Sequence, residues 1–354
     1  MFGSSRRQSQ KAGPESLQLQ AARDVVIGIS EKRAREIAKE TSRDVIASYT
    51  DEAFAVIQDR IFKLDDRVIA SLVRAGRIEA FADPGFQRTY KKAQNGAAST
   101  ERNSDYDMLA ALLADRADRG TERTIRAGIE RSIEIVDQVD DEALRALTVF
   151  QALQQYSPNS GLADEGLDAM ERLFEQLLDG PLPTGQEWME HLDILDALRI
   201  NTISKLRKFD DYYISKMIGY VAPGQDAATA AATIAGTEPP VAWSGLLIPH
   251  DLKPGFVRVA APTLDRLEAR LLIAGHEVQA LAIASARSDF GFGSEDPDCK
   301  LELMKRLKQR NSLRIASDWW DDIPQAAHVT AVGRVLARAN AERLDQDKLL
   351  PPLD

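Results

Sequence analysis

TERTIRAGIERSIEIVDQV, residues 121–139, decides the fold class of this chain. Its apolar residues Ile125, Ile129, Ile133 and Val136 recur every three or four positions, which is the spacing of side chains on one face of an α-helix. Comparable segments precede and follow it, and short polar turns separate them. Amphipathic helices joined by short turns are typical of a helical bundle, so we expect a mainly α-helical protein.

The composition agrees with a helical protein of more than one domain. Of the 354 residues, 44% are hydrophobic but only 6% are aromatic, and this mixture favours helix over strand. The expected organisation is a disordered tail at 1–16, a strand for assembly at 17–29, a helical bundle at 30–180 and a mostly helical C-terminal domain at 181–354. The last part also contains strand-rich sequence, so we expect a C-terminal α+β region that could be winged-helix-like.

The stretch SLQLQAARDVVIGIS, residues 16–30, is the clearest strand signal. Apolar residues alternate with other residues along it, which is the period of a strand with one buried face. The residues that would mediate assembly are Leu17, Leu19, Val25, Ile27 and Ile29. A strand in a helical protein must pair or leave backbone groups unsatisfied. It could pair with residues 246–260 or with its own copy in a second chain, and we favour the copy because a terminal strand can exchange between chains.

Local signals place the ends of several helices in the N-terminal half. Thr50 is expected to cap a helix whose apolar stripe covers residues 53–73, with a break at Asp65–Asp66. Residues 95–104, NGAASTERNS, are expected to be a polar loop.

The C-terminal half mixes helix and strand signals. Residues 187–200 are expected to form a helix, residues 243–262 an edge hairpin, and residues 263–286 another helix. Thr330 is expected to cap the last helix, and Gly333 in its first turn to let a neighbouring segment approach closely.

Charge and cysteine content limit the binding partners and the cellular compartment that we expect for the protein. The net charge of −10 opposes nucleic acid and anionic lipid at long range, without excluding a local basic site. The one cysteine, Cys299, excludes a disulfide within the chain and suits a reducing cytoplasm. The first residues lack the apolar stretch of a signal peptide, and no apolar run is long enough to span a bilayer. We therefore expect a cytoplasmic protein without membrane insertion.

Catalytic motifs are not recognisable, which makes an enzyme the less favoured interpretation. The four histidines follow no metal-ligand pattern, and the sequence contains neither GxSxG nor GxxxxGKS. Cys299 lies among acidic residues, which raise the pKa of a thiol. Asp298 and Lys300 have the spacing of a nuclease acidic-x-Lys triplet, but Asp296 to Asp298 more simply cap the helix that follows. We expect no cofactor and no metal, with a hydrolase or nuclease as a third alternative.

A basic stretch near the C-terminus is the second candidate binding site. Its cations are Lys305, Arg306, Lys308, Arg310 and Arg314. Basic residues next to aromatic ones can bind nucleic acid strands, and tryptophans follow at 319 and 320. Two aspartates come directly after the tryptophans and oppose phosphate. A solvated helix face is therefore favoured, and binding of an acidic partner is the functional alternative.

Residues 81–147, from FADPGFQRTYKKAQ to AGIERSIEIVDQVDDEALRAL, and HVTAVGRVLARANAER at 328–343 share their pattern of turns and helices with known sequences. They resemble an uncharacterised bacterial family of helical proteins known only by locus tags, as does QLQAARDVVIGIS before the first helix. The LLADR and TAVGR segments are similar to abortive-infection alpha proteins. The resemblance covers residues 17–155 and 320–345. It implies a helical bacterial protein with a role in phage defence, and it carries over no active-site residue.

Three functional hypotheses result. We favour a non-enzymatic, self-associating sensor or adaptor in bacterial stress or phage defence, whose partners are its own copies and another protein. The alternative is a DNA-associated regulator that uses the basic stretch and a winged-helix-like C-terminal part. The third is the hydrolase or nuclease. Under the favoured hypothesis, removing residues 1–29 lowers the oligomeric state and leaves the helicity intact.

Overall fold

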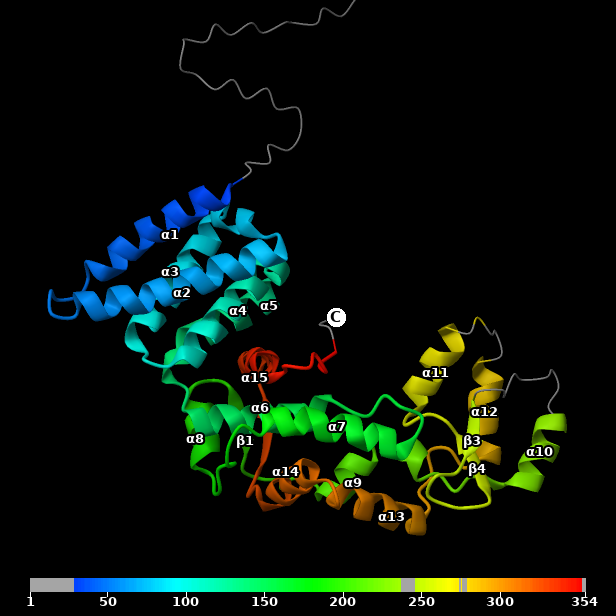
Figure 1. The fold of residues 1–354 in the computed structure, drawn as a ribbon. Coiled ribbons are helices and arrows are strands. Elements are labelled where there is room, and N and C mark those ends of the chain that lie inside the picture. Colours follow the sequence, from blue (N-terminus) through cyan, green and yellow to red (C-terminus); the bar gives the residue numbers. More distant parts are fainter. Residues whose placement is uncertain (1–28, 237–245, 274, 276–278, 352–354) are drawn as a thin grey trace, which may run out of the picture.

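The computed structural model describes residues 29–236, 246–273, 275 and 279–351. The described chain is mainly helical with small antiparallel sheets, which confirms the predicted fold class. Figure 1 shows the N-terminal helices gathered at one end, α15 beside α6 and α7, and α10, α11 and α12 at the other end. No helix in the described part of the chain could cross a membrane, because none is both long and apolar enough.

The N-terminal bundle is built from five α-helices and two short 3-10 helices. Their bounds are α1 Glu31–Ile46, α2 Phe54–Ala75, η1 Ile78–Ala82, α3 Pro84–Ser99, α4 Asn103–Arg119, α5 Arg123–Ile135 and η2 Val136–Gln138. Side-chain caps begin two of the helices, since Ser30 accepts a hydrogen bond from the Arg33 amide and Asp83 accepts from the amides of Gly85 and Phe86.

The predicted break at Asp65–Asp66 is wrong, because α2 runs through it. Asp65 accepts hydrogen bonds from Ser42 of α1 and from Tyr90 and Gln94 of α3, so this acid joins three helices rather than ending one. The helix also begins later than predicted: its N-cap is Ala53, not Thr50.

The predicted loop at 95–104 is also largely helical. Helix α3 extends to Ser99, and α4 begins at Asn103. Ala97 and Ala98 are buried, so packing against neighbouring helices outweighs the polar composition of this stretch.

A central layer of three helices follows the bundle. Its members are α6 Asp141–Gln155, α7 Ala163–Leu177 and the last helix, α15 Ala331–Leu344. Helix α15 packs against α4, α5, α6 and α7, so the end of the chain returns to the N-terminal bundle. Thr330 caps α15 by accepting from the Gly333 amide, as predicted. A Cβ on Gly333 would lie 2.0 Å from the carbonyl oxygen of Ala197, which confirms the predicted close approach.

The rest of the main body combines short helices with a two-stranded sheet. The elements are α8 Glu187–Ile194, β1 Leu198–Asn201, α9 Phe209–Ile214, η3 Ile218–Tyr220, α13 Pro297–Lys308, α14 Asn311–Asp322 and β5 Ala326–Val329. The predicted helix at 187–200 stops at Ile194; Asp196 then takes a positive φ of 62° and the chain enters β1. Strand β1 pairs antiparallel with β5. The two strands are so far apart in the sequence that the local residue pattern could not predict this pairing.

A small lobe lies at the end of the molecule that carries α10, α11 and α12 (Figure 1). Its elements are β2 Gln225–Asp226, α10 Ala227–Gly236, β3 Leu247–Pro249, β4 Phe256–Val259, α11 Leu264–Ile273 and α12 Gln279–Asp289. The predicted hairpin is present as β3–β4, and residues 263–286 contain two helices instead of one. In the described residues the hairpin joins β2, whereas β5 pairs with β1, so the hairpin is not a wing beside α15.

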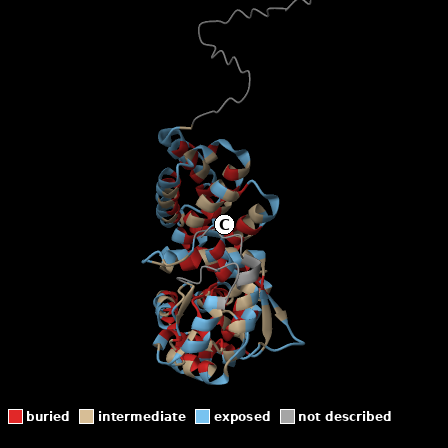
Figure 2. Ribbon diagram, turned by 90° about the vertical axis from the view of Figure 1, so that its right-hand side faces the viewer, coloured by how far each residue is buried: buried red, intermediate tan, exposed pale blue. Residues whose placement is uncertain are grey.

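Buried residues run through the interior of the molecule, while the outward faces of the helices are exposed (Figure 2). One apolar cluster extends from Ala34 in α1 to Ala341 in α15, so the core continues across residue 180. The small lobe has its own cluster, which includes Phe290 and Phe292.

Candidate functional site

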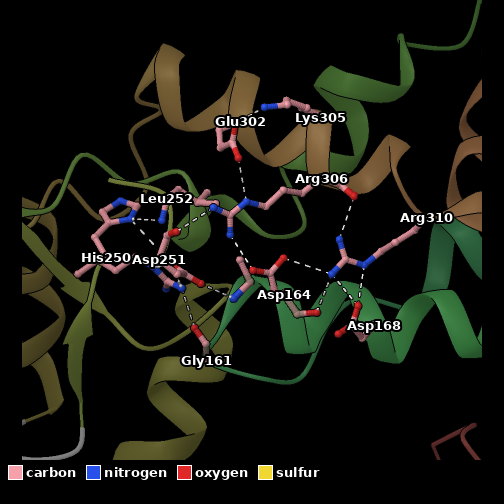
Figure 3. A network of polar contacts seen from close by, with 12 residues as sticks. Gly161, Asp164, Asp168, His250, Asp251, Leu252, Glu302, Lys305, Arg306 and Arg310 are labelled. Atoms are coloured by element: carbon pink, nitrogen blue, oxygen red, sulfur yellow. Dashed lines mark hydrogen bonds and ion pairs between the residues drawn. The ribbon is translucent and has the colours of Figure 1, made fainter. Parts of the chain in front are cut away.

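The basic stretch on α13 and α14 is bound into an ion-pair network (Figure 3). The Arg306 guanidinium donates to Asp164 at 2.7 Å, to Glu302 at 3.0 Å and to the Asp251 carbonyl oxygen at 3.1 Å. The Arg310 guanidinium donates to Asp164 and to Asp168, both at the start of α7. Arg306 of α13 and Arg310, the N-cap of α14, therefore fasten this region to the first two turns of α7, and Asp164 in the first turn is favourably placed against the helix dipole.

The other cations of the predicted basic stretch form longer ion pairs or are exposed to solvent. Lys305 lies 3.4 Å from Glu302, and Arg314 lies 3.4 Å from Asp318 on the same helix. Lys308 is exposed on the last turn of α13. Since the two least exposed cations, Arg306 and Arg310, already pair with acids of this chain, only the more exposed members of the stretch are available to a partner.

A buried ion pair lies at the centre of the same network. Arg258 of β4 is 0% exposed and donates to Oδ1 of Asp251 from Nε at 2.8 Å and from Nη2 at 2.7 Å. It also donates to the carbonyl oxygens of Val259 and Gly161. The second oxygen of Asp251 accepts from the amide of Ala163, the first residue of α7, at 2.6 Å. The pair therefore connects the small lobe to the main body.

His250 and Cys299 meet beside this pair, with Nε2 and Sγ 3.6 Å apart. Nδ1 of His250 accepts from the Leu252 amide, so Nε2 carries the proton and donates to the Ala222 carbonyl oxygen at 2.9 Å. Burial lowers the pKa of His250, and burial together with the charge of Asp296 raises the pKa of the Cys299 thiol to about 11. The imidazole is neutral with no acceptor nitrogen free, so it cannot deprotonate the thiol, and the pair is structural.

Residues in and beside the nuclease-like triplet make structural contacts with neighbouring groups of the chain. Asp296 caps α13 by accepting from the amides of Asp298 and Cys299, as predicted. Lys300 pairs with Asp211 at 2.9 Å and Glu295 at 3.1 Å. Within the described ranges no three metal-ligating side chains come together.

The predicted assembly strand falls mostly outside the described residues, since Leu17, Leu19, Val25 and Ile27 lie before residue 29. Ile29 is described and is not in a strand. It lies in an irregular conformation directly before the cap of α1, and it packs half-buried against the main core.

A groove with exposed aromatic side chains lies between the C-terminal half of α1 and the N-terminal half of α2. A groove of about 260 Å³ is lined by Lys39, Ser42, Arg43, Ile46, Ala47, Phe54, Gln58 and Phe62; we call it the α1–α2 groove. Phe54, Gln58 and Phe62 recur every four residues and so share one face of α2. The two phenylalanines are 46% and 44% exposed. The sequence carried a signal for this face, because the apolar stripe at 53–73 is wider than one buried face requires.

The rim of the α1–α2 groove carries positive charge. Two other cations of α1 have carboxylate partners, with Arg33 near Glu36 and Arg35 near Glu31. Within the described part of the chain, Lys39 and Arg43 have no carboxylate at ion-pair distance. An apolar groove with unpaired cations beside it suits an apolar side chain that is flanked by acids.

Comparisons with known proteins place the chain in a family without adding an activity. No curated protein matches the chain, and no solved structure matches it either. One family model matches residues 28–349, from just before α1 to beyond α15, and its description is only the suffix "-like". The match covers nearly the whole chain, including all the elements that form the α1–α2 groove and the ion-pair network. The chain belongs to the family that this model defines.

Proposed function

We propose that this protein is a non-enzymatic interaction protein that self-associates through its N-terminal end. The observation that carries the proposal is the α1–α2 groove, where Phe54 and Phe62 remain nearly half exposed beside two unpaired cations. Exposed apolar surface with a polar rim is characteristic of protein interaction sites. Fully burying an exposed phenylalanine side chain contributes about 1.5–3 kcal/mol, so completing the burial of these half-exposed rings contributes about half of that for each ring.

The occupant that fits best is the same segment of a second copy of the chain, that is, α1, α2 and the turn between them. Asp51 and Glu52 precede Phe54 directly, so each copy presents an aromatic side chain flanked by acids. Hydrogen bonds from the backbone and from Thr50 hold the pKa of Glu52 below its usual range, so it is ionised at neutral pH. Each copy also presents the cations Lys39 and Arg43. A two-fold interface in which Phe54 of each copy enters the groove of the other would pair these charges twice.

The predicted strand adds a second element to the same proposal. Residues 17–29 precede α1 in the sequence, and α1 also lines the groove, so strand exchange and the groove would both involve the N-terminal part of the chain. We place the protein in the cytoplasm as a sensor or adaptor, in bacterial stress or phage defence as the resemblance to abortive-infection alpha proteins implies.

The test is the mass in solution, measured by light scattering after size exclusion. We expect the full chain to form a dimer, and the double variant Phe54→Ser/Phe62→Ser to be a folded monomer with unchanged helicity by circular dichroism. Val56→Ser is the matched control, since Val56 is 53% exposed on α2 but does not line the groove; it should remain a dimer.

Charge reversal distinguishes specific ion pairing across the interface from non-specific association. Lys39→Glu/Arg43→Glu should dissociate the dimer, and adding Asp51→Lys/Glu52→Lys should restore it. A chain lacking residues 1–29 reports on the strand separately: a monomer would make the strand necessary as well. A full-length chain that is monomeric at all concentrations would contradict the proposal.

A further inference from the structure

A larger groove lies elsewhere, between the N-terminal bundle and α15. One part has a volume of about 600 Å³ and is lined by α2, α4 and α15; a second part of about 240 Å³ is lined by α5, α6 and α15. The two parts share Arg119, Val335 and Arg338, and we call them together the α15 groove. Small-molecule sites have volumes of about 300–1,000 Å³ and occur preferentially where structural units meet.

The floor of the α15 groove is apolar and made of small side chains. It includes Ala75 of α2, Ala111 and Ala114 of α4, and Val335 and Ala339 of α15. Short side chains leave a broad, flat surface, on which an apolar or aromatic body can lie close to the helices.

Four arginines surround this floor, and the acids that line it are already paired. The four are Arg74, Arg119, Arg334 and Arg338. The lining acids are held by arginines: Asp115 by Arg119, Asp118 by Arg77, and Glu342 by Arg338. Among the described residues, Arg74 and Arg334 have no carboxylate at ion-pair distance; Arg334 donates from Nη1 to the Val329 carbonyl oxygen at 2.9 Å. The groove therefore carries positive charge that the chain does not neutralise, in a protein of net charge −10.

Arg338, which lines both parts of the groove, is held in place. Its guanidinium donates to Glu342, to the Tyr156 hydroxyl at 3.1 Å and to the Pro351 carbonyl oxygen at 2.7 Å. Arg119 is likewise held by both oxygens of Asp115. Fixed arginines at the junction and unpaired ones on the walls are a suitable arrangement for a multivalent anion, because a guanidinium binds phosphate oxygens through two parallel hydrogen bonds.

We propose that the α15 groove binds a small organic phosphate whose apolar or aromatic body rests on the alanine floor. Arg334 and Arg74 bind the phosphate oxygens, and Arg119 and Arg338 contribute charge from fixed positions. Because α15 belongs to the central layer and packs against α4 and α5 of the bundle, the ligand would bridge the two parts of the molecule. This site is independent of the α1–α2 groove.

The test is isothermal titration calorimetry of the full chain in a phosphate-free buffer with ADP, glucose 6-phosphate and pyrophosphate as probes. We expect at least one organic phosphate to bind more tightly than pyrophosphate, and Arg74→Gln/Arg334→Gln to weaken that binding by at least about tenfold. Arg314→Gln is the control, since Arg314 is an exposed arginine that does not line the groove, and the variant should bind as the unmodified chain does.

Three outcomes would overturn the proposal. The first is that none of the probes binds at millimolar concentration. The second is binding that survives Arg74→Gln/Arg334→Gln unchanged, which would place the ligand elsewhere. The third is salt-dependent binding of a DNA duplex that the same variant abolishes while the small probes remain inert, which would assign the cations to nucleic acid.

Discussion

Asp251→Ala is expected to lower the free energy of unfolding by about 3–5 kcal/mol, the cost of removing one partner of a buried ion pair. Arg258 is 0% exposed and would keep its charge without a carboxylate. The amide of Ala163 at the start of α7 would lose its acceptor as well. Urea unfolding followed by circular dichroism measures the change.

The control for this prediction is Asp168→Ala in the same network. The Asp168 side chain is 63% exposed, and Arg310 keeps Asp164 as a partner, so the loss should stay within about 1 kcal/mol. The double variant Asp251→Ala/Arg258→Met should be more stable than Asp251→Ala alone, because it removes the uncompensated charge. Equal stability of the Asp251→Ala and Asp168→Ala variants would show that the buried pair does not anchor the small lobe.

Gly333→Ala is expected to destabilise the protein by about 2–3 kcal/mol, near the upper end of the usual cost of overpacking. The new Cβ would lie 2.0 Å from the Ala197 carbonyl oxygen and 2.9 Å from a Val329 methyl group. Neither side can retreat freely, because that carbonyl accepts from the amide and the hydroxyl of Thr330. The gain in helix propensity from glycine to alanine, less than about 1 kcal/mol, does not compensate.

Gly128→Ala provides the matched comparison for Gly333→Ala. Gly128 is also buried in a helix, but its added Cβ would meet Ala331 at an ordinary 3.7 Å. We therefore expect unchanged or higher stability, by up to about 1 kcal/mol. Thermal unfolding of the two variants side by side checks the contrast, and a Gly333→Ala protein as stable as Gly128→Ala would refute the close approach of β1 to α15.

The functional predictions depend on surfaces that the sequence displays only in part. The stripe at 53–73 contains Phe54 and Phe62, but periodicity cannot say which of its residues α1 covers. The sequence shows every cation of the basic stretch, but it does not show that Arg306 and Arg310 pair with acids of α7 that lie 142 residues away. Arg74 lies in no sequence motif, and the TAVGR segment that contains Arg334 was matched for its helix pattern rather than its charge, so only folding brings the two arginines to one groove.

By itself, the sequence determined the features that depend on residues within one helical turn. The helical fold class, the caps at Asp296 and Thr330, and the use of glycine at 333 follow from short-range periodicity and local hydrogen bonds. Tertiary structure alone decided where α8 gives way to β1, because β1 forms on β5, and the Thr330 hydroxyl reaches the Asp196 carbonyl oxygen 134 residues away. It also decided which cations are neutralised and which remain for a partner. The spacing of residues within one helix does not predict an ion pair with a helix that is distant in the sequence.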